Sequence, residues 1–502
     1  MNPLTAAGQD ALQRFGDRDV VHARGRWHSS GELEAQAVRW AAGLAGLGVR
    51  SGDRVLVLMP NAPEVGVSYS AVWRVGGVVV PVLFVAGPAD LAHAVRDSGA
   101  RVAITVPLLL TRLLEAAGDA LEHVVLVGEP GADADPRVLG EAGLTGEIPV
   151  ADGDAGTLAA LLYTGGTTGR AKGVCLSHGN LVAAAGAAVE AAHVPGVVRS
   201  LAVLPLAHVY GLTLSVAALL VPEPTTSVVL PWFVAADAIT AIEEHRLQSM
   251  PVVPSMLALL LAEGLAGRDL SSLTHVGSGG APLPDELARA FTAAVPHVVL
   301  REGYGATETC AICAVTRPDQ VVLGSVGTPA PGYSLRIADD DDRPLPAGEV
   351  GEVLVQGPGV TAGYWHDPEA TAVALRGGWL HTGDLGTLDV DGRLRIVDRK
   401  KDLIIRGGFN VYPRDVEDQL LEHPDVTAAA VVGRPHPVQG EEVVAVVSLR
   451  PGSTVTTEEL LAWARERMSA AKRPREVRIV DAVPLTGVGK TDRKAVRAAV
   501  LG

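Results

Sequence analysis

The sequence predicts a large α/β protein. Helix-covered, mostly parallel sheets should form its N-terminal part, an antiparallel β subdomain should follow, and a small α/β unit should end the chain. Three observations predict this order. Short apolar runs alternate with alanine-rich helical stretches over the first part of the chain. From Gly348 onward the segments become shorter and richer in turn residues. At 502 residues the chain is also longer than one hydrophobic core usually serves, so two or more domains are expected.

The first apolar runs have the length of strands. Each is bounded by turn residues and is apolar throughout, as is typical of parallel strands covered on both faces. The stretches between them are rich in alanine and have the length of helices. We therefore expect strands at 54–59, 102–106 and 123–127, and helices at 33–47 and 88–98.

The region after 348–355 carries a hairpin signal. Asp391-Gly392 separates Leu388 from Ile396, and Asp-Gly is a favoured turn between paired strands. This pattern predicts an antiparallel subdomain.

The end of the chain reads as a separate unit. We expect strands at 426–432 and 442–449 and a helix at 456–468, which begins with the capping box Thr456-Thr457-Glu458-Glu459. A dense charge run at 398–401 precedes this unit. We place the boundary there, which gives domains 1–398 and 399–502.

Composition and charge narrow the class of function. A net charge of −15 argues against a nucleic-acid partner, because binding to phosphates needs clustered lysine and arginine. The first ten residues have neither a basic start nor an apolar run, so no secretory signal is visible and a cytoplasmic location is expected. Three cysteines are too few for a disulfide framework, and small buried thiols are expected at Cys175, Cys310 and Cys313.

The segment 201–221 is apolar and long enough to cross a bilayer. Pro205, His208 and Gly211 instead favour a buried strand, a turn and a helix beside a pocket. We expect no membrane span.

A glycine- and threonine-rich segment at 162–173 predicts a phosphate-binding loop. Glycines let backbone N–H groups turn toward an anion, and hydroxyls and cations add further donors. The spacing is not that of a Walker loop, because Arg170 stands where glycine should precede the lysine and no Ser or Thr follows Lys172. Taken alone, the segment could also be a glycine-rich surface turn, which is the less favoured interpretation. The residues expected to contact phosphate are Thr164, Gly165, Gly166, Thr167, Thr168, Gly169 and Lys172.

Further motifs occur in a fixed order along the chain. With them the sequence resembles the acyl-adenylate-forming, or AMP-binding, superfamily, which includes acyl-CoA synthetases, coumarate ligases, luciferases and peptide-synthetase adenylation domains. The resemblance implies a large adenylation domain and a mobile C-terminal domain. The motifs are Gly48–Val55, Leu204–His208, Gly279–Leu283, Tyr304–Glu308, Gly383-Asp384, Asp398–Asp402 and Gly487–Arg493.

The resemblance implies an acyl-CoA synthetase. A carboxylic acid and ATP would give acyl-AMP and pyrophosphate, and CoA would then give acyl-CoA and AMP. ATP, Mg²⁺ and coenzyme A are the implied cofactors. An in-line attack on the α-phosphorus builds negative charge that a cation must offset, and the lysine of Gly487-Val488-Gly489-Lys490 is implied for this role.

The other nucleotide contacts are also implied by the resemblance. Asp384 and Arg399 would hold the ribose hydroxyls, and Glu308 would contact Mg²⁺, which prefers one or two carboxylates with phosphate oxygens. The implied catalytic set is Lys490, His208, Thr307 and Glu308, with Thr307 on the α-phosphate. Around the nucleotide the resemblance further implies Gly280, Ala281, Pro282, Gly303, Tyr304 and Ile396, of which Tyr304 and 280–282 would flank the adenine.

The acid is expected near His208, between two walls rich in small residues. The segments 205–214 and 277–307 contain no lysine and only two arginines, Arg289 and Arg301. We therefore expect an uncharged aliphatic, aromatic or polycyclic acid rather than a malonate-like one. The expected walls are Tyr210, Gly211 and Leu214 on one side, and Gly279, Gly305 and Ala306 on the other.

The resemblance implies that the C-terminal domain rotates between the two half-reactions, about a hinge at Lys401. Rotation would withdraw Lys490 and bring Arg406, Gly407, Gly408 and Phe409 to the site for CoA.

Three residues differ from the usual family pattern, and several alternative functions fit the same motifs. Gly165, Ala171 and Ala207 replace a serine, a proline and an aromatic residue that the family usually has. A ligase that loads an acyl-carrier protein, a luciferase-like oxygenase and a non-catalytic nucleotide-binding scaffold are the alternatives. The acid and the oligomeric state, monomer or homodimer, are open.

Overall fold

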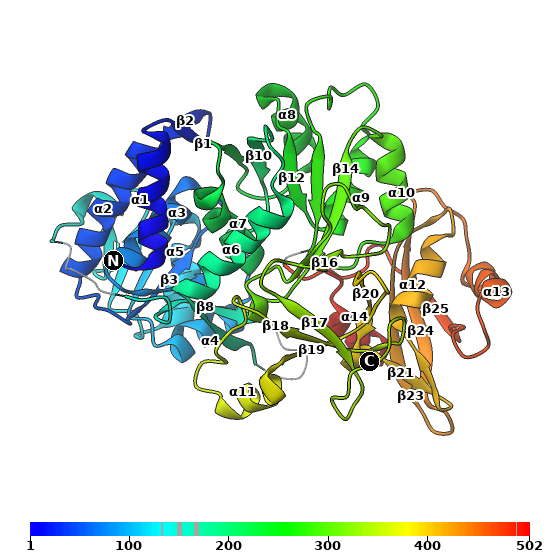
Figure 1. Cartoon of the computed structure of the whole chain (residues 1–502). Coiled ribbons are helices and arrows are strands. Elements are labelled where there is room, and N and C mark those ends of the chain that lie inside the picture. The colour runs from blue at the N-terminus through cyan, green and yellow to red at the C-terminus, as the bar shows by residue number, and fades with distance from the viewer. Residues whose placement is uncertain (132–133, 148–152, 165–169, 488, 502) are drawn as a thin grey trace.

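The computed structural model describes residues 1–131, 134–147, 153–164, 170–487 and 489–501. Valine-rich strands form two large sheets in the N-terminal part (Figure 1). The first is seven-stranded, in the order β7-β6-β5-β3-β4-β8-β9, and only its β8–β9 pair is antiparallel. Its strands are β3 (Arg54–Leu58), β4 (Val78–Val82), β5 (Val102–Thr105), β6 (His123–Leu126), β7 (Val138–Gly140), β8 (Leu158–Thr164) and β9 (Lys172–Ser177).

The second sheet is nine-stranded and carries the site. Its order is β16-β15-β14-β13-β12-β10-β11-β1-β2, and the strands from β1 to β14 in this order run parallel. Parallel strands end at the same edge, so loops after β13 and β14 meet there. The strands are β1 (Asp19–Ala23), β2 (Arg26–Ser29), β10 (Arg199–Ala202), β11 (Thr226–Val229), β12 (Ser249–Val252), β13 (His275–Ser278), β14 (Val299–Tyr304), β15 (Ala314–Val315) and β16 (Thr328–Pro329).

Helices cover the two large sheets. Residues of α6 and α7 join the apolar core of the first sheet, while Tyr210 and Leu214 of α7 pack against the core of the second. Several helices begin with proline, whose fixed φ suits the first turn. The helices of this part are α1 (Pro3–Phe15), α2 (Ser30–Gly46), α3 (Pro63–Arg74), α4 (Pro88–Ser98), α5 (Pro107–Ala117), α6 (His178–Ala192), α7 (Val209–Leu220), α8 (Ala235–His245), α9 (Pro254–Glu263) and α10 (Asp285–Ala294), with short 3₁₀ turns η1 (Glu141–Gly143) and η2 (Thr307–Thr309).

An antiparallel four-stranded sheet follows, in the order β17-β18-β19-β20. The predicted Asp391-Gly392 turn joins β19 to β20, and Leu388 pairs with Leu394 across it. The hairpin prediction is thus confirmed. The elements are β17 (Ser334–Ala338), β18 (Gly351–Gln356), α11 (Pro368–Ala374), η3 (Arg376–Gly378), β19 (Leu380–Leu388), β20 (Leu394–Arg399) and η4 (Lys400–Asp402).

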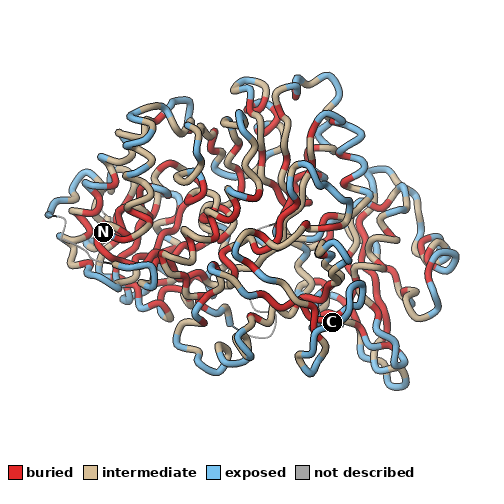
Figure 2. Tube along the Cα trace, viewed as in Figure 1, coloured by how far each residue is buried: buried red, intermediate tan, exposed pale blue. Residues whose placement is uncertain are grey.

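The C-terminal residues build a sheet of their own, at the right of Figure 1. The predicted capping box at Thr456 is present, with reciprocal bonds between Thr456 and Glu459. Its apolar strands are buried between helices, and the red interior of Figure 2 continues into this unit. The elements are β21 (Ile404–Arg406), β22 (Phe409–Val411), α12 (Pro413–Leu421), β23 (Val426–His436), β24 (Gly440–Leu449), α13 (Thr457–Arg467), β25 (Glu476–Ile479) and α14 (Arg493–Leu501).

The apolar segment 201–221 forms the end of β10, a turn and α7, as predicted. No helix among the described residues is both long and apolar enough to cross a membrane. Of the cysteines, Cys310 and Cys313 are buried and Cys175 is half-buried.

Candidate active site

The predicted nucleotide, acyl and hinge residues that the structure describes gather around one cavity of about 2370 Å³, whereas the predicted CoA residues 406–409 do not line it. Both large sheets, the antiparallel sheet and the C-terminal unit contribute to its walls. The predicted phosphate-loop residues Gly165, Gly166, Thr167, Thr168 and Gly169 lie outside the described residues. The predicted site residues that line the cavity are Thr164, Lys172, His208, Tyr210, Gly211, Leu214, Gly279, Gly280, Ala281, Pro282, Gly303, Tyr304, Gly305, Ala306, Thr307, Glu308, Asp384, Ile396, Arg399, Lys401 and Lys490.

Asp384 joins three elements in one polar cluster. It pairs with Arg399 across β19 and β20, and its Oδ1 lies 3.0 Å from the Nε of Arg399. The hydroxyl of Tyr304, at the end of β14, donates to Asp384 Oδ2 at 2.7 Å. Asp384 is buried, and it raises the pKa of Arg399. Burial, reinforced by Asp384, raises the pKa of Tyr304. This cluster places a carboxylate, a phenol and a guanidinium at one edge of the sheet.

Lys490 enters the cavity from the C-terminal unit. A tight turn presents it, in which Thr486 N donates to Lys490 O at 2.7 Å and Lys490 N donates to Thr486 Oγ1 at 3.2 Å. Its Cε passes 3.6 Å from the position that a Cβ on Gly280 would occupy. Burial, helped by the charge of Arg399, lowers the pKa of Lys490 to about 8, although Asp384 and Glu308 act in the opposite direction. The turn therefore holds one cation among the predicted nucleotide ligands.

Glu308 lies in η2, directly after β14. The hydroxyl of Tyr364 donates to its Oε1 at 2.9 Å, and Lys172 Nζ lies 5.0 Å from the centre of the Tyr364 ring. One carboxylate with a free oxygen suits Mg²⁺, which takes its other ligands from phosphate and water. We did not predict Tyr364 from the sequence, because its only signal there is the segment Gly363-Tyr364-Trp365.

His208 caps α7. Its Nδ1 accepts from the N–H of Tyr210 at 3.2 Å, which fixes the ring and leaves Nε2 for the cavity. Burial, with the charge of Lys490, lowers the pKa of His208 to about 3. The ring is neutral at pH 7 and can donate or accept, but it does not supply a charge.

Glycine is required at the predicted acyl-wall positions for two different structural reasons. A Cβ on Gly279 would lie 3.2 Å from the Tyr210 ring, so this glycine leaves room for the aromatic side chain. A Cβ on Gly211 would lie 2.3 Å from Pro205 O, and one on Gly305 would lie 1.8 Å from Ala311 O. Gly211 and Gly305 therefore permit close backbone packing. They do not simply add volume to the pocket, as small residues on its walls were expected to do.

The predicted CoA segment forms a hairpin turn between β21 and β22. Gly407 and Gly408 have positive φ, as a tight hairpin requires. Arg406 does not fit the expectation that it contacts CoA, because its buried side chain lies 2.8 Å from Glu442 and donates to three carbonyls of the C-terminal unit. Phe409, in contrast, is 65% exposed.

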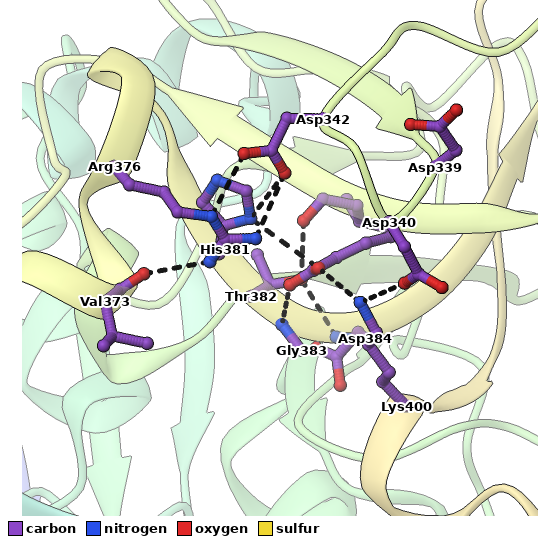
Figure 3. A network of polar contacts seen from close by, with 12 residues as sticks. Asp339, Asp340, Asp342, Val373, Arg376, His381, Thr382, Gly383, Asp384 and Lys400 are labelled. Atoms are coloured by element: carbon purple, nitrogen blue, oxygen red, sulfur yellow. Dashed lines mark hydrogen bonds and ion pairs between the residues drawn. The ribbon is translucent and has the colours of Figure 1, made fainter. Parts of the chain in front are cut away.

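Ion pairs fix the chain just before the predicted hinge. Figure 3 shows Lys400 reaching Asp340 at 2.7 Å, and its Nζ also lies 3.2 Å from Glu352. Glu352 accepts from the N–H of Gly383 at 3.1 Å. Through Glu352, Lys400 thus connects the chain directly before Lys401 to the segment that carries Asp384. Sequence reasoning missed this anchor.

The chain resembles known proteins over its whole length. Residues 8–365 match the family described as AMP-binding enzyme, and residues 415–490 match the AMP-binding enzyme C-terminal domain. It is 37% identical over 469 residues to a feruloyl-CoA synthase of Amycolatopsis sp, which covers 93% of this chain and 92% of that protein. It is 33% identical over 524 residues to a long-chain-fatty-acid–CoA ligase of Bacillus subtilis, with coverages of 97% and 92%.

A solved structure agrees with this. The amide bond synthetase McbA from Marinactinospora thermotolerans superposes with a TM-score of 0.88 at 32% identity, and the match covers 99% of this chain and 100% of that one. Ordered motifs, a cavity that gathers them and full-length similarity lead to one conclusion. The chain belongs to the AMP-binding enzyme family, and it is an AMP-forming acid–CoA ligase that uses ATP, CoA and Mg²⁺.

Proposed function

We propose that this ligase activates a bulky, mostly apolar carboxylic acid, with Lys490 as the cation of the adenylation step. The observation that carries the assignment of Lys490 is its position over Gly280, near Asp384, Arg399 and Glu308. The acid lies between α7 and the glycine-rich ends of β13 and β14. Leu214, Gly279 and Ala306 line that part of the cavity, which favours a bulky, mostly apolar acyl group.

In the first half-reaction a carboxylate oxygen attacks the α-phosphorus of ATP in line, and pyrophosphate leaves. The ammonium of Lys490 offsets negative charge on the transferring group, while Asp384 and Arg399 hold the ribose. Thr307 donates to the α-phosphate, and His208 orients the acid. Glu308 would hold Mg²⁺, which would supply charge neutralisation at the phosphates. Lys490 comes from the C-terminal unit, whereas Thr307, Glu308, Asp384 and Arg399 lie in η2, β19 and β20. The site is therefore complete only when the C-terminal unit is in place.

In the second half-reaction the thiol of CoA attacks the acyl carbon, and AMP leaves. The part of the C-terminal domain that follows Lys401 rotates about this residue and withdraws Lys490 from the site. Lys400, bound to Asp340 and Glu352, marks the fixed side of that hinge. The exposed Phe409 hairpin is then the surface that meets CoA.

The rate of adenylation should fall as pH rises through about 8. The pKa of Lys490 is lowered to about 8, so its charged form is complete below that pH and is lost above it. We expect kcat/KM for pyrophosphate release to show this alkaline limb. In Lys490→Arg, whose guanidinium stays charged, the limb should vanish from the residual activity. A flat wild-type profile to pH 9.5 would contradict the assignment.

Mass spectrometry of the protein with Mg²⁺-ATP and a mixed carboxylic-acid library tests the proposed function. Parallel samples contain CoA, no acceptor, or a primary amine. We expect acyl-CoA only with CoA and acyl-AMP without it. Amide as the main product would support an activity like that in the name of McbA. Acyl-AMP unchanged in every sample would point to a carrier protein as acceptor, and neither product with any acid would reject the proposal.

A further inference from the structure

One arginine stands on the acyl-facing side of the second sheet. Arg301 of β14 pairs in register with Gly277 of β13, and paired residues point to the same face. On that face the Tyr210 hydroxyl lies 3.8 Å from where a Cβ on Gly277 would be. Arg301, Gly277 and Tyr210 all line the cavity. The guanidinium therefore lies beside the tyrosine, among positions otherwise occupied by glycine.

The charge of Arg301 has no carboxylate partner among the described residues: burial lowers its pKa, and the group that acts in the opposite direction is Tyr210. Strand alternation places its neighbour Glu302 on the opposite face of the sheet. The charge of Arg301 acts on two side chains, Tyr210 and His275. Burial, with the charge of Arg301, lowers the pKa of His275. This part of the cavity thus contains a cation and uncharged groups.

The hydrogen bonds of Arg301 are also incomplete. One terminal nitrogen donates to Ala192 O, at the end of α6, at 3.1 Å. Its Nε is buried and has no hydrogen-bond partner within the described part of the chain. A buried N–H donor without an acceptor is costly unless a ligand supplies one. The free energy therefore favours an acceptor that arrives with the substrate.

We propose that Arg301 binds an oxygen acceptor at the far end of the acyl group, so that the preferred acid is an apolar body with a carbonyl, phenol or carboxylate oxygen opposite its reacting carboxylate. This inference rests on the proposed function, since it places the acid in the same cavity. It also revises the expectation of an acid that is apolar throughout. Arg301 and Gly303 are two residues apart on β14, or roughly 7 Å, so one ring with a short linker spans the distance.

A matched series of acids tests the proposal. The best acid of the library supplies the scaffold, and its distal substituent is methyl, acetyl or carboxylate. With the unmodified enzyme we expect kcat/KM for an acceptor acid to exceed that for the methyl acid about 10- to 100-fold. A higher kcat/KM for the acetyl acid than for the carboxylate acid indicates a neutral acceptor, and the reverse order indicates an anionic one. In Arg301→Met that ratio should fall to about 1 or below.

Arg14→Met is the matched control. Arg14 donates to Leu219 O and Val221 O at the end of α7, as Arg301 does to the end of α6, but it does not line the cavity. If Arg301 only holds a helix end, both variants will lower kcat/KM equally for all acids, and this overturns the proposal. So does a wild-type preference for the methyl acid, while acyl-CoA formation itself stands. No product from any acid would reject the proposed function and this proposal with it.

Discussion

Lys490→Ala is expected to lose acyl-AMP formation while it still converts supplied acyl-AMP and CoA to acyl-CoA. The lysine is the one cation that the C-terminal unit places over Gly280 within the described part of the site. Removing a preorganised donor from a developing charge lowers kcat about 100- to 1,000-fold. The second half-reaction builds its charge at the acyl carbon, after Lys490 has been withdrawn, and should change less than about threefold.

The two half-reactions must be measured separately. Pyrophosphate release without CoA reports the first, and thioester formation from synthetic acyl-AMP reports the second. Arg465→Ala is the control, because this exposed arginine of α13 does not line the cavity and should affect neither rate. An equal loss of both rates in Lys490→Ala would reject the rotation about Lys401 and would place the lysine in one fixed site.

The regular elements were largely predictable because the periodicity is strong. The helix at Pro88–Ser98 was predicted with both ends, since proline starts it and Gly99 follows with positive φ. The helix predicted at 33–47 begins earlier, at Ser30, because the Ser29 side chain accepts from Glu32 N. β23 runs on to His436, past the predicted 432, although Pro435 lies within it. The strand is at the edge of its sheet, where a proline is tolerated.

The site was predictable where residues belong to ordered motifs, and was not where the contact is between distant, isolated residues. The motifs placed Asp384, Arg399 and Lys490 in the site, and the cavity gathers them. Tyr364 reaches Glu308 over 56 residues and carries no periodic signal. Arg301 was equally unpredictable, because it contacts the end of α6, 109 residues away in the sequence. That its Nε lacks a partner among the described residues is seen only in the three-dimensional structure.

Asp384→Ala is expected to lower kcat/KM for ATP about 100-fold, mainly through KM, because two hydrogen bonds to the ribose are lost. The variant also leaves the Tyr304 hydroxyl and Arg399 without their shared carboxylate. Since the Arg399 side chain is about half exposed, water replaces part of that contact. We expect a loss of about 2 kcal/mol in the free energy of unfolding, not the larger cost of a fully buried pair.

Tyr304→Phe separates the nucleotide effect from the structural one. It removes the 2.7 Å bond to Asp384 but leaves the carboxylate and its ion pair with Arg399. We therefore expect it to raise KM for ATP less than about tenfold. ATP titrations of pyrophosphate release and thermal unfolding without nucleotide check both variants. If Asp384→Ala unfolds earlier but keeps its KM for ATP, the carboxylate only orients Tyr304 and Arg399. A raised KM in a stably folded Asp384→Ala, with Tyr304→Phe close to the unmodified enzyme, means that Asp384 itself holds the ribose.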